Sequence, residues 1–92
     1  MQFDNQAVGA VICRYRKEKG MTQELLSGLA GIARSHLSMI ESGAKQPNFE
    51  TIWRLADALG IRSSELVAEI ETETEKRKHH SIMSLQKQPP GQ

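Results

Sequence analysis

The sequence predicts an all-α protein of five short helices, and three features support this. Apolar residues recur every three or four positions in successive stretches, the spacing that places them on one face of a helix. Glycine ends four of these stretches, and Thr22 and Asn48 stand where a helix N-cap is expected. A chain of 92 residues with a polar end suits one small domain, so these helices should share a single core.

The first, fourth and fifth helices are predicted from their apolar faces. The first runs from Ala7 to about Lys19 and follows a polar lead-in, residues 1–6. The fourth runs from Phe49 to Leu59 after Asn48, and the fifth begins with Ser63 as its N-cap. Their apolar sets are Val8, Val11, Ile12 and Tyr15 in the first, Ile52, Leu55, Ala56 and Leu59 in the fourth, and Leu66, Val67 and Ile70 in the fifth.

The stretch from Thr22 to Gly43 predicts two short helices joined by a tight turn. Gly31 falls at the turn, where a helix C-cap favours a residue that tolerates positive φ. Leu37 and Ile40 share one face of the second helix. The opposite face carries polar or flexible side chains, which are Arg34, Ser35, Ser38 and Met39. A helix that lies in a DNA major groove needs such a stripe, whereas a buried helix does not.

Composition argues against several other classes of function. No apolar run approaches 18 residues and the N-terminus lacks a signal-peptide pattern, so we expect no membrane partner. Cys13 is the one cysteine and cannot form an internal disulfide, which favours a reducing cytoplasm. No carboxylate pair, nucleophile–base pair or glycine-rich phosphate loop indicates an enzyme. The histidines and Cys13 match no metal-ligand spacing, so we expect neither a metal nor another cofactor.

A change in composition divides the chain. Residues 1–70 are predicted to form the helix-turn-helix domain, and residues 71–92 a polar C-terminal extension. Glu71 to His80 contains no apolar residue, so this extension is expected either to continue the fifth helix or to be disordered.

Four motifs within this pattern carry a family resemblance. They are GMTQ at residues 20–23, AGI at 30–32, IESG at 40–43, and P-x-x-x-T-I followed by LADALG between 47 and 60. In these motifs the chain resembles the Cro/lambda-repressor helix-turn-helix family, also called XRE-like, over about residues 8–66. The resemblance implies a compact five-helix domain that binds double-stranded DNA operators, usually as a homodimer. It also implies a bacterial or phage protein that acts in the cytoplasm, at the nucleoid.

The resemblance further assigns roles to individual residues. Base-facing positions of the recognition helix correspond to Ala33, Arg34, Ser35, Ser38 and Met39. Phosphate contacts correspond to Thr22 and Gln23 at the start of the second helix and to Lys45, Gln46 and Asn48 in the loop before the fourth. Arg16 and Glu41 occupy the positions of a structural ion pair. Ala33 departs from the family pattern, because many members have Ser or Thr there as N-cap. Ala cannot cap a helix, and the missing cap loosens the helix start by about 1 kcal/mol.

Several of these roles have an alternative. Arg34 is expected to pair with guanine O6 and N7, and otherwise it is a solvated side chain that touches only phosphate. Met39 lies against a thymine methyl group or is a partly covered surface side chain. Asn48 is a phosphate contact or only a helix cap.

The predicted function is that of a sequence-specific transcriptional regulator, most simply a repressor, that binds a palindromic operator as a dimer. The predicted dimer interface consists of apolar side chains that single helix faces cannot all bury, which are Trp53, Leu66, Val67 and Ile70. An antitoxin or a restriction–modification controller would use the same domain. A protein-interaction adaptor that does not read DNA is a further alternative, because residues 7–70 carry eight basic and seven acidic side chains. No small-molecule effector is evident.

Overall fold

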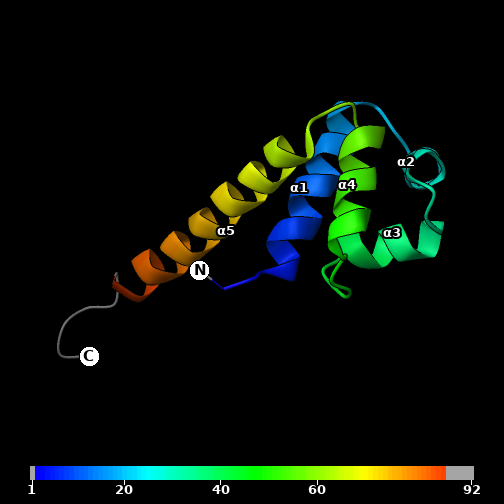
Figure 1. Ribbon diagram of the computed structural model, residues 1–92. Helices are drawn as coiled ribbons and strands as arrows, with labels where there is room; N and C mark the ends of the chain where they lie inside the picture. The colour runs from blue at the N-terminus through cyan, green and yellow to red at the C-terminus, as the bar shows by residue number, and fades with distance from the viewer. Residues whose placement is uncertain (1, 87–92) are drawn as a thin grey trace.

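The computed structural model describes the backbone of residues 2–86 and the side chains of residues 2–78, and this range contains five helices and no strand. The helices are α1 (Asn5–Glu18), α2 (Gln23–Ala30), α3 (Arg34–Glu41), α4 (Phe49–Ala58) and α5 (Ser63–Gln86). In Figure 1, α1 and α4 occupy the centre, α2 and α3 lie on one side of them, and α5 lies on the other. The predicted all-α fold class is confirmed.

The capping side chains explain where three of the helices begin. The Thr22 hydroxyl accepts a hydrogen bond from the Leu25 N–H at 3.1 Å, and the Asn48 side-chain oxygen accepts one from the Thr51 N–H at 2.8 Å, as the sequence predicted. The predicted start of α1 at Ala7 is wrong by two residues. The Asp4 carboxylate accepts the N–H groups of residues 6 and 7, so it caps α1 and brings residues 5 and 6 into the helix.

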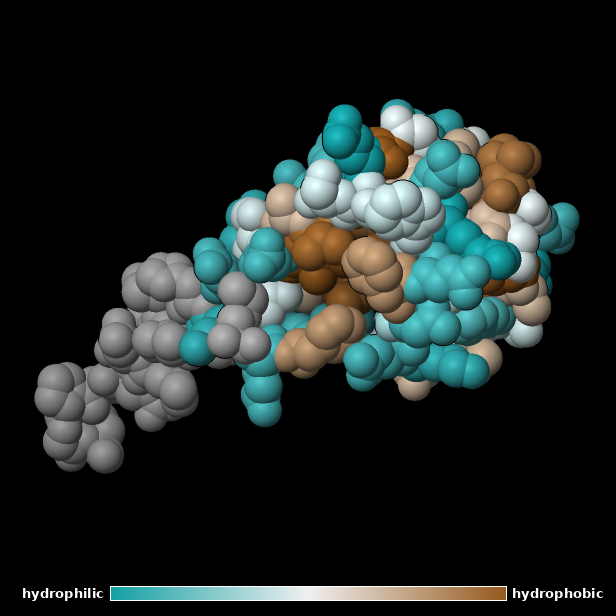
Figure 2. Space-filling view, viewed as in Figure 1, coloured by the Kyte–Doolittle hydropathy of each residue, from teal (hydrophilic) through white to brown (hydrophobic). Residues whose placement is uncertain are grey.

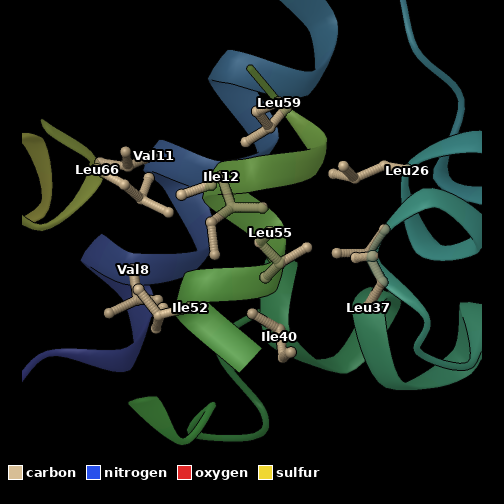
Figure 3. Close-up of a cluster of buried hydrophobic side chains, with 12 residues drawn as sticks. Val8, Val11, Ile12, Leu26, Leu37, Ile40, Ile52, Leu55, Leu59 and Leu66 are labelled. Carbon is tan, nitrogen blue, oxygen red and sulfur yellow. The ribbon is translucent and has the colours of Figure 1, made fainter. Parts of the chain in front are cut away.

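The core is one apolar cluster to which all five helices contribute, as Figure 3 shows. Leu55 of α4 lies at its centre with no exposed surface, between Ile12 of α1 and Leu37 of α3. Leu26 of α2 and Leu66 of α5 are also fully buried. Because α4 contacts both α2 and α5, the helix-turn-helix and the C-terminal helix are held by the same central side chains.

The helix α5 packs along α1 and then extends beyond the other helices (Figure 1). Arg14 of α1 pairs with Glu69 at 3.0 Å and approaches Glu73 to 4.0 Å, one turn further along α5. The helix crosses residue 70 without a break, and residues 71–86 continue it, whereas residues 87–92 lie outside the described part of the chain. Ser63 is the first residue of α5 and not its N-cap, because the Leu66 N–H bonds to the Arg62 carbonyl. Within the described residues, no helix is long and apolar enough to cross a membrane.

We predict that Leu55→Ala lowers the free energy of unfolding by about 2–5 kcal/mol, because it leaves a cavity where three helices meet. Urea unfolding followed by circular dichroism measures this loss. Leu29→Ala is the matched control, since Leu29 is 58% exposed and its truncation should change stability by less than about 0.5 kcal/mol. Equal losses in the two variants would contradict the central position of Leu55.

Candidate nucleic-acid interface

The turn between α2 and α3 fixes the angle between these two helices. Gly31 ends α2 with φ +72°, a left-handed conformation that glycine adopts without strain. The N–H of Ile32 bonds back to the Ser27 carbonyl at 3.0 Å, which closes the C-terminal turn of α2. The Ile32 side chain packs against the core directly after the turn. The turn therefore directs the chain into α3 within three residues.

The helix α3 has one face in the core and one face in solvent. Leu37 and Ile40 are fully buried, so they anchor the helix in the core, where α3 contacts α1 and α2. All five predicted base-contact residues, Ala33, Arg34, Ser35, Ser38 and Met39, are exposed. As the family departure predicts, Ala33 makes no side-chain cap, and the start of α3 has no such support. The outer stripe of α3 is therefore free of the protein's own interior and faces outward as a rigid surface.

The start of α3 lies close to the start of α2. Arg34, the first residue of α3, lines a shallow hollow of about 370 Å³ together with Arg16 and three residues at the start of α2, Thr22, Gln23 and Glu24. Within the described residues, no carboxylate lies at ion-pair distance from the Arg34 guanidinium. The positive end of the α2 dipole also favours an anion here, so this edge is where the phosphate contacts predicted for Thr22 and Gln23 would form.

A partly buried ion pair joins α1 to the end of α3. The Arg16 guanidinium donates from Nε to Glu41 at 2.7 Å and from Nη2 to the other carboxylate oxygen at 3.0 Å, so the pair is bidentate. The side chains are only 12% and 6% exposed. Arg16 also donates to the Met21 carbonyl, which ties the α1–α2 loop to the same group. The structure thus contains the ion pair that the resemblance implied.

The Glu41 carboxylate stays ionised despite its burial. Burial by itself raises the pKa of this carboxyl, but the hydrogen bonds from Arg16 and Gln23 outweigh it and hold the pKa below its ordinary value of 4.5. The hydrogen bond to Glu41 likewise raises the pKa of Arg16. Both partners are therefore charged at neutral pH.

The predicted phosphate-contact residues divide into three groups. Gln23 is not simply solvated, because its Nε2 donates to Glu41 at 3.0 Å and so fixes the orientation of the amide beside α3. Thr22 and Asn48 each use their side-chain oxygen to cap a helix. Lys45 and Gln46 are exposed in the loop between α3 and α4. All five remain predictions as phosphate contacts.

Gly9 is a positioning residue that the sequence reasoning missed. A Cβ atom at Gly9 would lie 2.5 Å from the carbonyl oxygens of both Ile40 and Glu41, so only glycine lets α1 approach the end of α3 this closely. Gly9, Cys13 and Arg16 follow one another at helical spacing on the same face of α1. A glycine inside an amphipathic helix was the available signal, since it weakens the helix unless packing requires it.

The predicted dimer residues have different environments. Trp53 is 57% exposed and Val67 is 37% exposed, while Ile70 is partly buried. Leu66 is fully buried in the core of the single chain, so its assignment to the dimer interface is wrong. It lies on the inner face of α5 against α1 and α4, whereas Val67 falls about 100° further round the helix.

This geometry defines a class of protein. A two-helix unit with a tight turn and an outward polar stripe on its second helix is the arrangement of a helix-turn-helix DNA-binding regulator. The chain belongs to the helix-turn-helix family HTH_3, which matches residues 14–66. The family resemblance predicted from the sequence motifs is confirmed, and the family consists of regulators and not of enzymes.

The chain is similar in sequence to a transcriptional regulator and to a phage repressor. The chain is 42% identical over 60 residues to an uncharacterized HTH-type transcriptional regulator, y4dJ of Sinorhizobium fredii, a match that covers 65% of this chain and 78% of the relative. It is 40% identical over 62 residues to the immunity repressor protein of Bacillus phage phi105, which covers 67% of this chain and 43% of the repressor. The chain thus spans less than half the length of that repressor.

Two solved structures share the fold. The restriction–modification controller C.AhdI from Aeromonas hydrophila superposes with a TM-score of 0.67 at 35% identity, and the match covers 68% of this chain and 96% of the controller. The controller C.Esp1396I, a tetramer in complex with its natural 35 base-pair operator, gives a TM-score of 0.71 at 26% identity over 79% of this chain and 96% of that chain.

We predict that Glu41→Gln destabilises the protein by about 1–3 kcal/mol at pH 7, because it leaves the partly buried Arg16 charge without its charged partner. The contribution of Glu41 is present above pH 4.5 and is lost as the pH falls through its lowered folded-state pKa. The stability difference between wild type and Glu41→Gln should therefore shrink as the pH falls below 4.5. Urea unfolding of both proteins between pH 3 and pH 7 measures it, and a constant difference over that range would refute this role.

Proposed function

We propose that this protein is a repressor that binds a palindromic operator as a homodimer and places α3 in the major groove. The observation that carries the proposal is the outward stripe of α3, in which Arg34, Ser35, Ser38 and Met39 are exposed while Leu37 and Ile40 hold the helix from below. A rigid helix with hydrogen-bonding side chains on its free face is what base readout requires.

Each predicted contact has a defined chemical role in this proposal. Arg34 donates two hydrogen bonds to the O6 and N7 atoms of a guanine. Ser35 and Ser38 bond to base edges or to phosphate, and Met39 and Ala33 lie against thymine methyl groups. Thr22 and Gln23 at the start of α2, with Lys45, Gln46 and Asn48 in the following loop, contact the phosphates on either side and set the register of α3.

A homodimer with two-fold symmetry is consistent with the length of α3 and with the proteins that this chain resembles. One recognition helix of eight residues covers a single major-groove half-site, so a longer operator needs a second copy about 34 Å away. The phage relative is an immunity repressor, and one structural neighbour is a tetramer on its operator. These similarities support a homodimer that blocks a promoter by occupying it.

A restriction–modification controller is the second candidate function, because C.AhdI shares 35% identity over 68% of this chain. A controller would use the same DNA-binding surface as a repressor, so the two candidate functions differ in the genes that the protein controls. Selection of bound sequences from random duplexes, followed by a search of the adjoining genes for a restriction endonuclease or a toxin, separates them.

We predict that Arg34→Ala removes the preference for one base pair in each half-site, because the guanidinium is exposed and has no carboxylate partner among the described residues. The expected loss of discrimination is about 1–3 kcal/mol per guanine, with weak binding to random DNA retained. Fluorescence anisotropy on the selected operator and on single-base variants measures it. Met39→Ala is a control with a smaller change, and an equal loss on all sequences would make Arg34 a phosphate anchor.

We predict a steep salt dependence that separates DNA binding from the adaptor alternative. If the exposed cations and the α2 edge contact phosphates, affinity for the operator should fall about 10³-fold or more between about 50 and 200 mM salt. Anisotropy titrations at four salt concentrations give the slope. A flat dependence together with binding no tighter than that of an unrelated protein would favour an adaptor that does not read DNA.

A further inference from the structure

An exposed apolar face lies where α4 and α5 meet. Two aromatic side chains at the start of α4, Phe49 and Trp53, are 69% and 57% exposed, and their ring centroids are 6.1 Å apart. We call this pair the aromatic ridge. It adjoins an apolar hollow of about 350 Å³, which is lined mainly by Phe3, Val8, Pro47, Ile52, Val67 and Ile70. Figure 2 shows brown and tan atoms gathered in this region, with pale and teal atoms around them.

The hollow is built from three separate parts of the chain. Val8 of α1 and Ile52 of α4 are almost fully buried and form its floor, while Val67 and Ile70 of α5 form one side. Phe3, which precedes α1, is 59% exposed and also lines the hollow. The side chains that line it are mostly apolar, so water in the hollow gains few hydrogen bonds and an apolar side chain would displace it favourably.

The ridge and the hollow together are self-complementary. A two-fold interface brings the same patch of both copies together, so that patch must offer a projecting group and a recess for it. Here Phe49 both projects from α4 and borders the hollow, which places the two features side by side. A small ligand would need the recess alone, and it would leave the exposed aromatic ridge without a partner.

We propose that this face is the self-association interface, in which the aromatic ridge of one copy inserts into the apolar hollow of the other. The proposal rests on the proposed function in that it supplies the interface for the homodimer. It also revises the interface predicted from the sequence, because it keeps Trp53, Val67 and Ile70, omits Leu66 and adds Phe3 and Phe49. The additions come from the segment before α1 and from the first residue of α4.

The area of the face suits a second copy. Aromatic side chains bury about 150–250 Å² each, so Phe3, Phe49 and Trp53 together expose roughly 300–450 Å² of apolar surface. That is the size of the largest apolar patch on a typical monomer and matches the central part of an interface of about 800 Å² per partner. Beside the ridge, Glu50 and Arg54 pair with each other at 3.0 Å, so the rim offers charges that are already compensated.

The interface also shares a wall with the loop predicted to contact DNA. Gln46, Pro47 and Asn48 line the hollow, and Asn48 caps α4 directly before Phe49. A second copy seated in the hollow therefore restricts the same loop that carries the predicted phosphate contacts. Self-association should order this loop before DNA is bound, which couples dimer formation to operator affinity.

The test compares the self-association of three proteins by sedimentation equilibrium without DNA. We expect Phe49→Ser to weaken association by about 30-fold or more, the change typical of truncating a central aromatic residue in an interface. Leu29→Ser is the matched control, because Leu29 of α2 is 58% exposed but lies outside the face, and it should associate like wild type. Val67→Glu is a second variant that places a charge in the hollow and should also be monomeric. Thermal unfolding checks that each variant is folded.

The outcomes separate this proposal from the proposed function. If wild type dimerises and both Phe49→Ser and Val67→Glu dimerise equally well, the face is wrong while the dimeric repressor stands. If wild type stays monomeric at millimolar concentration and also on palindromic DNA, the dimer itself is wrong. If both face variants are monomeric and the Leu29→Ser control is not, the face is supported.

A second measurement tests the link to the loop. Amide hydrogen exchange of wild type, followed by mass spectrometry, should slow in the peptide that contains residues 44–48 as protein concentration rises through the association range. The Phe49→Ser variant should show no such change at the same concentrations. Association of wild type without any protection of this loop would overturn the placement of the second copy in the hollow.

Discussion

The bidentate contact between Arg16 and Glu41 is the interaction on which the geometry of the outward surface of α3 depends. The recognition helix has only eight residues, and a helix of this length is not stable by itself. Its first turn lacks a side-chain cap, so its position is determined by its buried side chains and by its C-terminal end. The ion pair and the close approach of Gly9 both act at that end, which lies against α1.

The same carboxylate connects the fold to the predicted phosphate contacts. Glu41 accepts hydrogen bonds from α1 through Arg16 and from α2 through Gln23, so three helices meet at one buried charge. An ionised group with so little exposure is costly unless several donors surround it, and this requirement fixes the relative positions of those donors. Gln23 therefore has a structural contact in addition to the DNA contact proposed for it.

Most of the fold could be predicted from the sequence, because apolar spacing and caps act locally. Gly31, Thr22 and Asn48 mark their helix ends through hydrogen bonds to residues within four positions. The start of α1 does not follow from apolar spacing, because Asp4 and the two residues after it are all polar and only the Asp4 cap marks the helix end. The outward stripe of α3 follows from the positions of Leu37 and Ile40, since the buried side of a short amphipathic helix leaves the opposite side exposed.

The sequence by itself thus determined the five helices, the family and the residues that face outward on α3, because these depend on periodicity and on short motifs. Only the tertiary structure decided that Leu66 belongs to the core and that Phe3 and Phe49 stand beside Val67. These residues are far apart in the chain, and neighbouring positions on α5 differ in exposure according to which helix packs there. Burial is a property of the packed arrangement of several helices, and no local pattern contains it.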